Sequence, residues 1–337
     1  MGKPFIIPIF LSHAGCPHRC VFCNQTAITG KNEDFPSAEA LRFEINRHLA
    51  YKGQNRGETE ISFFGGNFLG LSPEKIRRCL DITTEYKDLK LIDSIRCSTR
   101  PDTITPGTLK VIAPYPVKTV EIGMQSMAEN VLSLSRRGHG AASVRQAMRL
   151  LKQAGYQTGM QMMIGLPGDN AVATALTARE ILEMAPNMVR IYPTLVIKAS
   201  PLARWYRENR YTPLSLAACV TRLKQLYQLF TAHQIKVIRM GLQATDGLSK
   251  DHVIAGPYHP ALGHMVLSAI LLEQAIFEVQ RISPVQTQVR LRIHPKSVSQ
   301  MQGLNKKNLV VLKDAFPLTR IRLEPDPEMP ELSVIAE

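Results

Sequence analysis

The chain of 337 residues lacks any uninterrupted apolar run approaching the roughly 20 residues that a membrane-spanning helix needs. No signal peptide opens it. Only six residues are cysteine, and three of them, Cys79, Cys97 and Cys219, are scattered through helix-like and strand-like segments. We therefore expect no disulfide framework and no membrane association, and the reduced thiols typical of a cytoplasmic protein.

Acidic side chains are scarce relative to basic ones. The chain has 41 Lys and Arg against 28 Asp and Glu, a formal net charge of +13. The excess lies entirely in residues 1–240, which hold 31 basic and 18 acidic side chains, whereas residues 241–337 hold 10 of each. A basic region of this kind is compatible with nucleic acid, an acidic membrane surface or a polyanionic small molecule.

Strand-like and helix-like segments alternate through the first 240 residues. The expected strands are residues 5–11, 60–64, 94–98, 119–123, 157–164 and 188–196. Helix signals stand between them, as in Ser72-Pro73-Glu74, where a capping serine precedes a proline in the first turn and an acidic residue. Six βα units predict an α/β fold, a partial (β/α)6 barrel with its chemistry at the carboxyl ends of the strands.

Three cysteines stand within eight residues on the loop that leaves the first expected strand. Cys16, Cys20 and Cys23 have the spacing C-x3-C-x2-C. They could hold a structural zinc ion with His13 or His18 as the fourth ligand, or be unrelated buried thiols. They could instead hold an iron–sulfur cluster in which one iron has no protein ligand, and the spacing favours this third interpretation.

The spacing of the three cysteines is the cluster motif of the radical S-adenosylmethionine (SAM) superfamily, which the chain resembles. The resemblance implies a [4Fe–4S] cluster whose open iron binds SAM and passes it an electron from an external donor, producing a 5′-deoxyadenosyl radical. It places Phe22 near the adenine. It also implies that backbone groups of Gly65 and Gly66, which follow the second strand, hold the amino group of the methionine part of SAM. Asn67 stands where many members have glutamate.

A second motif extends the resemblance. Residues 120–126, V-E-I-G-M-Q-S, followed by Arg137-Gly138-His139, are similar to the G-x-Q-S…R-x-H signature shared by the oxygen-independent coproporphyrinogen oxidase group and the catalytic subunit of Elongator. The resemblance implies that Gln125 and Arg137 contact SAM, and Arg137 could pair with its carboxylate. Ser98, at the end of the third expected strand, belongs to the same expected cofactor-binding set.

Within this pair of families the chain resembles the Elongator subunit more closely. The segments that carry the likeness are Thr99–Asp102, Gly165–Gly168 and Arg190–Ile197. The likeness covers about residues 3 to 240 and implies an RNA substrate, with tRNA favoured. It does not extend to the acetyltransferase domain of the tRNA-modifying members, because only about 97 residues follow Met240 and they contain no glycine-rich acetyl-CoA loop.

Two further residues are expected at the reacting centre. Tyr192 ends the sixth expected strand, and its phenol could orient substrate or donate a hydrogen atom; the alternative is a half-buried aromatic whose hydroxyl is paired. Arg100 could bind an anionic group of the substrate. Its alternative is an internal salt bridge with Asp102 or Glu121.

Residues 241–337 are expected to form a small α/β extension, separate from a core of residues 1–240. A strand at 288–293, a helix at 297–315 and a strand at 319–323 faintly resemble an RNA-binding KH module. The G-x-x-G loop of that module is absent and the region is electrically neutral, so capping of the open barrel is the favoured role.

Together these patterns predict a radical SAM enzyme that abstracts hydrogen from RNA. A second hypothesis keeps the chemistry but assigns a small anionic substrate, such as a tetrapyrrole or a cofactor precursor. A third is a non-catalytic iron–sulfur protein, against which the SAM-binding motifs argue. The sequence specifies neither the reductant nor the oligomeric state.

Overall fold

The computed structural model describes residues 4–25, 35–53, 56–242, 252–282 and 287–337. The chain forms two compact units. One contains Met1–Leu214 and Phe230–Tyr258, and the other contains Ser215–Leu229 and His259–Glu337. The larger unit is called the N-terminal unit below, and the smaller one the C-terminal unit.

A curled sheet of seven parallel strands forms the centre of the N-terminal unit. In sheet order the strands are β1 (Phe5–Phe10), β2 (Thr59–Phe64), β3 (Ser94–Thr99), β4 (Val117–Gln125), β5 (Gln157–Ile164), β6 (Met188–Pro193) and β8 (Lys236–Met240). This confirms the predicted α/β partial barrel. The seventh strand was not predicted, because β8 has only five residues and two of them, Lys236 and Arg239, are charged.

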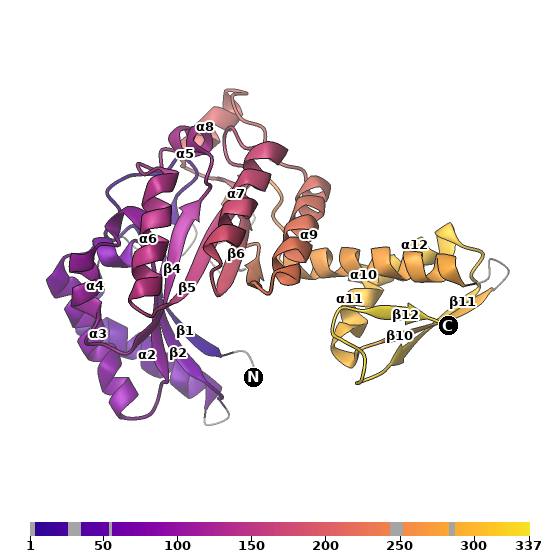
Figure 1. Ribbon diagram of the computed structural model, residues 1–337, viewed down its shortest axis with the longest axis horizontal. Coiled ribbons are helices and arrows are strands. Elements are labelled where there is room, and N and C mark those ends of the chain that lie inside the picture. The colour runs from indigo at the N-terminus through magenta and orange to yellow at the C-terminus, as the bar shows by residue number, and fades with distance from the viewer. Residues whose placement is uncertain (1–3, 26–34, 54–55, 243–251, 283–286) are drawn as a thin grey trace. The chain divides into compact units, whose positions relative to one another are not determined.

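Helices connect successive strands and cover the outer face of the sheet, as α6 and α7 show in Figure 1. They are α2 (Ala38–Lys52), α3 (Pro73–Asp88), α4 (Pro106–Ile112), α5 (Glu129–Leu134), α6 (Ala141–Gln153), α7 (Ala171–Met184) and α8 (Pro201–Arg207). Helix α9 (Leu216–Ala232) belongs to the C-terminal unit as far as Leu229. The predicted cap of α3 is confirmed, since the Ser72 hydroxyl accepts a hydrogen bond from the Lys75 backbone N–H.

The two faces of the sheet differ in chemistry. Alternate residues of β2, β3 and β4, such as Ile61, Ile95 and Val120, are fully buried apolar side chains. The residues between them on the same strands include buried charges, among them Arg96 and Glu121. Because side chains alternate along a strand, the apolar set covers one face and the charged set covers the other.

The C-terminal unit is a small α/β structure, as predicted. Its three strands are β11 (Arg320–Pro325), β10 (Gln288–Ile293) and β12 (Val334–Ala336), in that order, and its helices are α10 (Leu262–Arg281), α11 (Val298–Gln302) and α12 (Lys307–Ala315). The single helix predicted at 297–315 is wrong. The chain breaks it at Gly303, Asn305 and Lys306, which all have positive φ angles that a right-handed helix excludes.

Helix α10 corrects the expectation that no segment could span a membrane. An 18-residue window within its 20 residues has a mean hydropathy of 1.4, so length and composition alone would allow it to cross a bilayer. One face of the helix, with Leu271, Ala275 and Val279, lies in the core of the C-terminal unit. Glu273 forms an ion pair of 2.9 Å with Lys224. The core helix of a globular unit passes the same test, so α10 is weak evidence for a membrane.

Candidate active site

The three cysteines of the predicted cluster motif lie together on the loop after β1. Cys20 is buried, Cys16 and Cys23 are half-buried, and all three are free thiols. Burial and then the Cys20 thiol raise the pKa of Cys16, and the same two causes, followed by Cys16, raise the pKa of Cys23 to about 12. The three sulfur atoms are therefore near enough to act on one another electrostatically.

The arrangement of the thiols bears on the kind of metal they could hold. Within the described parts of the chain, no three His, Cys, Asp or Glu side chains meet closely enough to hold a single metal ion. A structural zinc site requires that convergence. A [4Fe–4S] cluster does not, because each of its cysteines binds a different iron. The geometry of the three thiols is compatible with a cluster.

The glycine pair after β2 allows the cysteine loop to lie directly on the end of that strand. A Cβ atom on Gly66 would collide with the backbone carbonyls of Leu11 and Ala14. Gly65 has a φ of 94°, and its carbonyl accepts a hydrogen bond from the Gln25 side-chain amide. The absence of side chains at this pair therefore serves loop packing. The predicted contact of the pair with SAM stays a prediction.

Asn67 fastens the cysteine loop to the ends of two strands. Its Nδ2 donates to the Gly15 carbonyl at 2.8 Å. Its Oδ1 accepts from the Thr99 hydroxyl at 2.6 Å, the Thr103 hydroxyl at 2.9 Å and the Arg100 backbone N–H at 2.9 Å. The side chain is fully buried. An amide that donates on one side and accepts on the other suits this position, whereas a glutamate could only accept.

Arg137 contacts the cysteine loop directly. Its Nη1 donates to the Cys20 sulfur at 3.0 Å, and its Nη2 donates to the Gly123 carbonyl on β4. Its own carbonyl accepts from Arg100 Nη2 at 2.6 Å. The contact places a guanidinium beside one of the three sulfur atoms expected to bind the cluster.

Arg100 forms the internal salt bridge that the sequence left open as an alternative. Its guanidinium makes two hydrogen bonds to Asp102, of 3.0 and 2.9 Å, and only 4% of its surface is exposed. The predicted contact with an anionic substrate would have to use the remaining Nη1. That atom is buried and has no hydrogen-bond partner within the described residues.

Other buried nitrogens near the loop lack partners as well. Arg137 Nε and both ring nitrogens of His139 have none in the described parts of the chain. Burial, then Arg137 and Arg100, lowers the pKa of His139 to about 4, so its ring is neutral near pH 7. Unpartnered buried donors are costly unless a ligand meets them. The unpartnered N–H donors of Arg100 and Arg137, with one N–H of the neutral His139 ring, lie beside the three thiols and fit a cluster with a bound anionic ligand.

The remaining predicted cofactor residues lie on two sides of this centre. Gln125 follows a bulge in β4, with a φ of 70°, and its side-chain oxygen accepts from Gln161 on β5 at 3.2 Å. Phe22 packs against two apolar clusters, one containing Tyr211 and the other Leu166. Ser98 is half-buried on β3. Arg137 Nη2 donates to the carbonyl of Gly123, which precedes Gln125 on β4, so the structure brings Arg137 close to Gln125.

Sequence analysis missed a chain of buried ion pairs on the inner face of the sheet. Arg96 makes hydrogen bonds of 2.6 and 2.8 Å to Glu60 and of 2.7 Å to Glu121. Glu121 also accepts from Arg190 at 2.6 and 2.9 Å, and Arg190 donates to the Tyr192 hydroxyl at 3.4 Å. The signal was present in the sequence: Glu60, Arg96, Glu121 and Arg190 each stand among apolar residues of a strand, and they comprise two charges of each sign.

The network fixes the charge states of its members. Burial alone would raise the pKa of Glu121, but Arg190 and Arg96 hold it below its ordinary value. Tyr192, the predicted residue at the reacting centre, is thereby tied to the network through Arg190, with its hydroxyl paired. The alternative expected from the sequence, a half-buried aromatic whose hydroxyl is paired, therefore describes Tyr192 in the structure. Its role toward the substrate stays a prediction.

Two protein-family models match the chain. The model of the radical SAM superfamily matches residues 11–181, and that of the radical SAM C-terminal domain matches residues 186–271. The second match crosses the predicted boundary at residue 240. Together they cover the cysteine loop, every strand of the curled sheet except β1, and the start of α10.

Curated relatives are 25 to 30% identical to the chain over the residues that align. The tRNA uridine(34) acetyltransferase of Dehalococcoides mccartyi is 26% identical over 230 residues, which are 59% of this chain and 50% of the relative. Elongator complex protein 3 of Saccharomyces cerevisiae is 30% identical over 190 residues, 56% of this chain and 31% of the relative. The chain thus spans half or less of the length of these relatives.

Solved structures show the same fold. Elp3 from the archaeon Methanocaldococcus infernus superposes with a TM-score of 0.65 at 21% identity, covering 80% of this chain and 63% of that one. The coproporphyrinogen III oxidase HemN of Escherichia coli gives a TM-score of 0.50 at 15% identity, covering 68% and 53%. The fold, the family models and the cysteine loop agree: the chain is an enzyme of the radical SAM superfamily.

Proposed function

We propose that the chain holds a [4Fe–4S] cluster on Cys16, Cys20 and Cys23 and uses it for radical chemistry on RNA, with tRNA as the favoured substrate. The three thiolates would hold the cluster, whose chemistry when bound would be the one-electron reduction of SAM by an external donor. The observation that carries the proposal is the contact of Arg137 Nη1 with the Cys20 sulfur at 3.0 Å, beside buried donors without partners.

The chain's own residues have distinct tasks in this proposal. The three thiolates would hold the cluster, and Arg137 would stabilise their negative charge. The unpartnered nitrogens of Arg100, Arg137 and His139 would meet the carboxylate of SAM or an anionic group of the substrate. The set proposed to surround the rest of SAM is Phe22, Gly65, Gly66, Ser98 and Gln125.

On the substrate side, we propose that Tyr192 faces the reacting atoms, because it is next to the last residue of β6, near the carboxyl edge of the sheet. Arg190 would orient its phenol through the 3.4 Å hydrogen bond. The division into a catalytic core of residues 1–240 and an extension of residues 241–337 is part of the same proposal. A tRNA substrate would place the enzyme in the cytoplasm.

Two observations support RNA as the substrate class. Curated relatives carry names that refer to tRNA uridine(34) acetylation. The excess of 13 positive charges lies in residues 1–240, and such an excess favours a polyanionic partner. A small anionic substrate is the second candidate. The single unpartnered Nη1 of Arg100, buried beside the cysteine loop, suits one carboxylate better than an RNA backbone.

Binding measured at several salt concentrations distinguishes these candidates. The reconstituted full chain is titrated with unfractionated tRNA under anaerobic conditions. Many phosphate contacts predict an affinity that falls steeply with salt, because counterions are released on binding. Absence of tRNA binding at low salt would reject the RNA proposal and favour the small substrate.

A further inference from the structure

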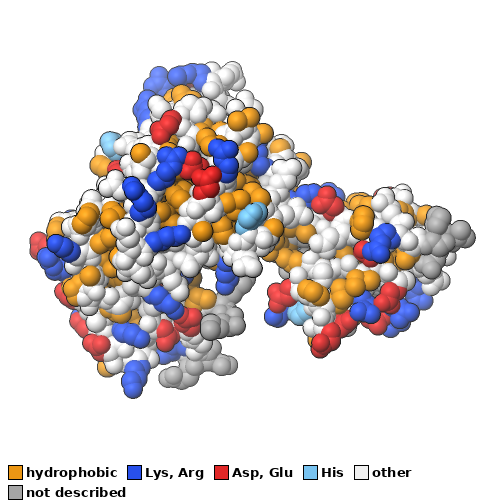
Figure 2. All heavy atoms as spheres, viewed as in Figure 1, with side chains coloured by type: hydrophobic (Ala, Val, Ile, Leu, Met, Phe, Trp, Pro, Cys, Tyr) orange, Lys and Arg blue, Asp and Glu red, His pale blue; other side chains and the backbone are white. Residues whose placement is uncertain are grey.

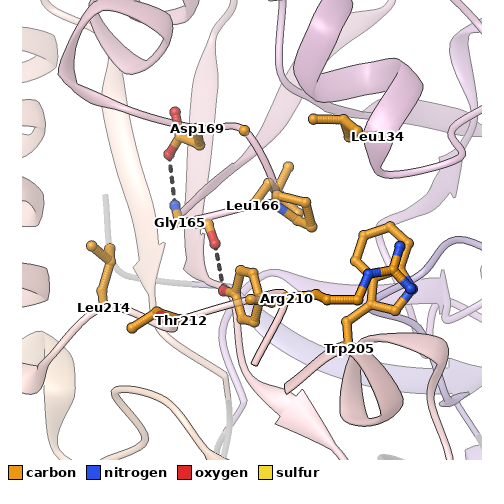
Figure 3. Close-up of a pocket in the computed structure, with 11 residues that line it drawn as sticks. Leu134, Gly165, Leu166, Asp169, Trp205, Arg210, Thr212 and Leu214 are labelled. Atoms are coloured by element: carbon orange, nitrogen blue, oxygen red, sulfur yellow. Dashed lines mark hydrogen bonds between the residues drawn. The ribbon is translucent and has the colours of Figure 1, made fainter. Parts of the chain in front are cut away.

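A pocket of about 370 Å³ lies beside the loop that follows β5, shown in Figure 3. One wall is the segment Gly165–Asp169. The others are Leu134 at the end of α5, Trp205 on α8, and the segment Arg210–Leu214 that follows α8. The volume falls in the range of about 300 to 1,000 Å³ that is typical of ligand sites.

The wall after β5 has a fixed conformation. Gly165 and Gly168 have φ angles of 76° and 80°, which favour glycine. The Asp169 carboxylate accepts from the Gly165 backbone N–H at 2.6 Å, and the Tyr211 hydroxyl donates to the Gly165 carbonyl at 2.6 Å (Figure 3). These contacts tie the β5 loop to the segment after α8, so the pocket is built into the fold.

The lining combines a flat aromatic surface, a cation and apolar walls. The Arg210 guanidinium lies over the Trp205 ring, 5.3 Å from its centroid. Leu134, Leu166 and Leu214 supply apolar contacts. A planar, uncharged ring can stack on an indole or on a guanidinium, so this lining suits a heterocyclic base.

Arginines are concentrated on and just after α8, the helix that carries Trp205. Arg204 and Arg207 lie on α8, and Arg210 follows it. Glu208 offsets part of this charge, with ion pairs of 2.7 Å to Arg204 and 3.1 Å to Arg210. Figure 2 shows Lys and Arg side chains gathered where Figure 1 places α8. Three arginines against Glu208 and the lining Asp169 leave an excess of one positive charge, which favours the phosphate of a nucleotide over an uncharged aromatic ligand.

The pocket is distinct from the proposed SAM site but adjacent to it. None of the proposed SAM-binding residues lines it. Phe22, which precedes Cys23, packs against one apolar cluster that contains Tyr211 and another that contains Leu166, and both of these residues line the pocket. A single layer of side chains therefore separates the pocket from the cysteine loop.

We infer that this pocket binds an unstacked base of the RNA substrate, which stacks on Trp205 and Arg210 while the arginines of α8 hold its phosphate. The inference rests on the proposed function, since it takes RNA as the substrate. A base held here would fix the register of the strand, so that a neighbouring nucleotide reaches the cysteine loop. Stacking platforms of this kind bind single-stranded RNA with little sequence preference.

Trp205 is the only tryptophan in the chain, so its fluorescence reports on this pocket alone. The reconstituted full chain is titrated anaerobically with a single-stranded RNA oligonucleotide that carries a dye at one end. Fluorescence anisotropy of the dye measures RNA binding, and the emission of Trp205 measures stacking. Heparin, a polyanion without bases, serves as the comparison ligand. We expect saturable quenching of Trp205 by RNA and none by heparin.

Variants separate the charge of Arg210 from its flat surface. Arg210→Ala should weaken RNA binding about tenfold and reduce the quenching, since one stacked base and one cation are lost. Arg210→Lys should retain more affinity than the alanine variant but not the quenching, because an ammonium group cannot stack. Arg77→Ala removes the same charge from an exposed position on α3, away from α8 in Figure 1, and should change neither signal.

The outcomes show separately whether the pocket inference fails and whether the RNA proposal fails. If RNA binds but leaves Trp205 emission unchanged, or if Arg210→Ala binds RNA like Arg77→Ala, the pocket inference is overturned and the RNA proposal stands. If RNA does not bind the wild-type chain at low salt, both are overturned. Quenching by heparin equal to that by RNA would show that charge alone is sensed and would also reject a base pocket.

Discussion

At the scale of single residues, Asn67 shows how one side chain can hold a reactive loop in place. It joins the loop backbone at Gly15 to the end of β3 at Thr99 and Arg100, and it is fully buried. Sequence analysis identified this position only as a departure from the usual glutamate. The reason for the amide is visible only in three dimensions, because its partners are 52, 32 and 33 residues away.

Asn67→Ala tests this role. The substitution leaves the Gly15 carbonyl and the Arg100 backbone N–H buried without partners, so we expect a loss of about 2 to 3 kcal/mol in the free energy of unfolding. We also expect less iron bound per chain after reconstitution. Urea denaturation and iron analysis measure both. The control Gln146→Ala removes an exposed amide from α6, and equal behaviour of the two variants would contradict the account.

Arg137 was predicted from the sequence to contact the SAM carboxylate. In the structure, two of its three guanidinium nitrogens donate to other groups of the protein. Nη1 contacts the Cys20 sulfur and Nη2 contacts Gly123, so only Nε has no partner among the described residues. An N–H donor on a ligand sulfur stabilises the reduced, more negative state of an iron–sulfur cluster and raises its reduction potential.

Arg137→Gln should therefore shift the reduction potential of the reconstituted cluster to a more negative value, even without SAM. A redox titration followed by electron paramagnetic resonance measures this shift. Arg136→Gln changes the exposed neighbouring arginine and should leave the potential unaltered. An Arg137→Gln potential identical to wild type would mean that the arginine acts on SAM alone.

At the scale of secondary-structure elements, the two faces of the sheet are stabilised differently. Ion pairs connect the strands on the inner face, whereas helices cover apolar side chains on the outer face. Glu60, Arg96, Glu121 and Arg190 come from β2, β3, β4 and β6. Sequence patterns located six of the seven strands because buried parallel strands are continuous apolar runs. They could not pair the charges, since strand register and curvature decide which charges meet.

Arg96→Met tests what the network contributes. It leaves the carboxylate of Glu60 without its buried partner and Glu121 with one of two, so we expect the free energy of unfolding to fall by about 3 to 5 kcal/mol. Arg42→Met breaks the exposed pair of 2.6 Å with Glu85 and should cost at most about 1 kcal/mol. Equal urea midpoints for the two variants would refute a structural role for the network.

At the scale of the whole molecule, the chain has two compact units with separate apolar cores. The core of the C-terminal unit includes Leu271, Leu291 and Leu312, all fully buried. Sequence analysis predicted its first strand correctly but missed β12, a strand of three residues, and the break between α11 and α12. Short strands and isolated left-handed residues leave too weak a pattern for detection.

Leu291→Ala should destabilise the C-terminal unit by about 2 to 5 kcal/mol, because it opens a cavity in that core. Iron incorporation at the cysteine loop should not change, since the loop belongs to the other unit. Hydrogen exchange read by mass spectrometry would show faster exchange in β10 and α10. Comparable acceleration in β1 to β6 would show that the two units unfold together.

The most direct test of the central claim is whether the chain cleaves SAM. The protein is reconstituted anaerobically with iron and sulfide, reduced, mixed with SAM and analysed by chromatography for 5′-deoxyadenosine, beside a Cys20→Ala variant. The account predicts the nucleoside from wild type, none from the variant, and faster formation when tRNA is added. A fully loaded cluster that yields no 5′-deoxyadenosine with tRNA present, and whose paramagnetic resonance is unchanged by SAM, would contradict it.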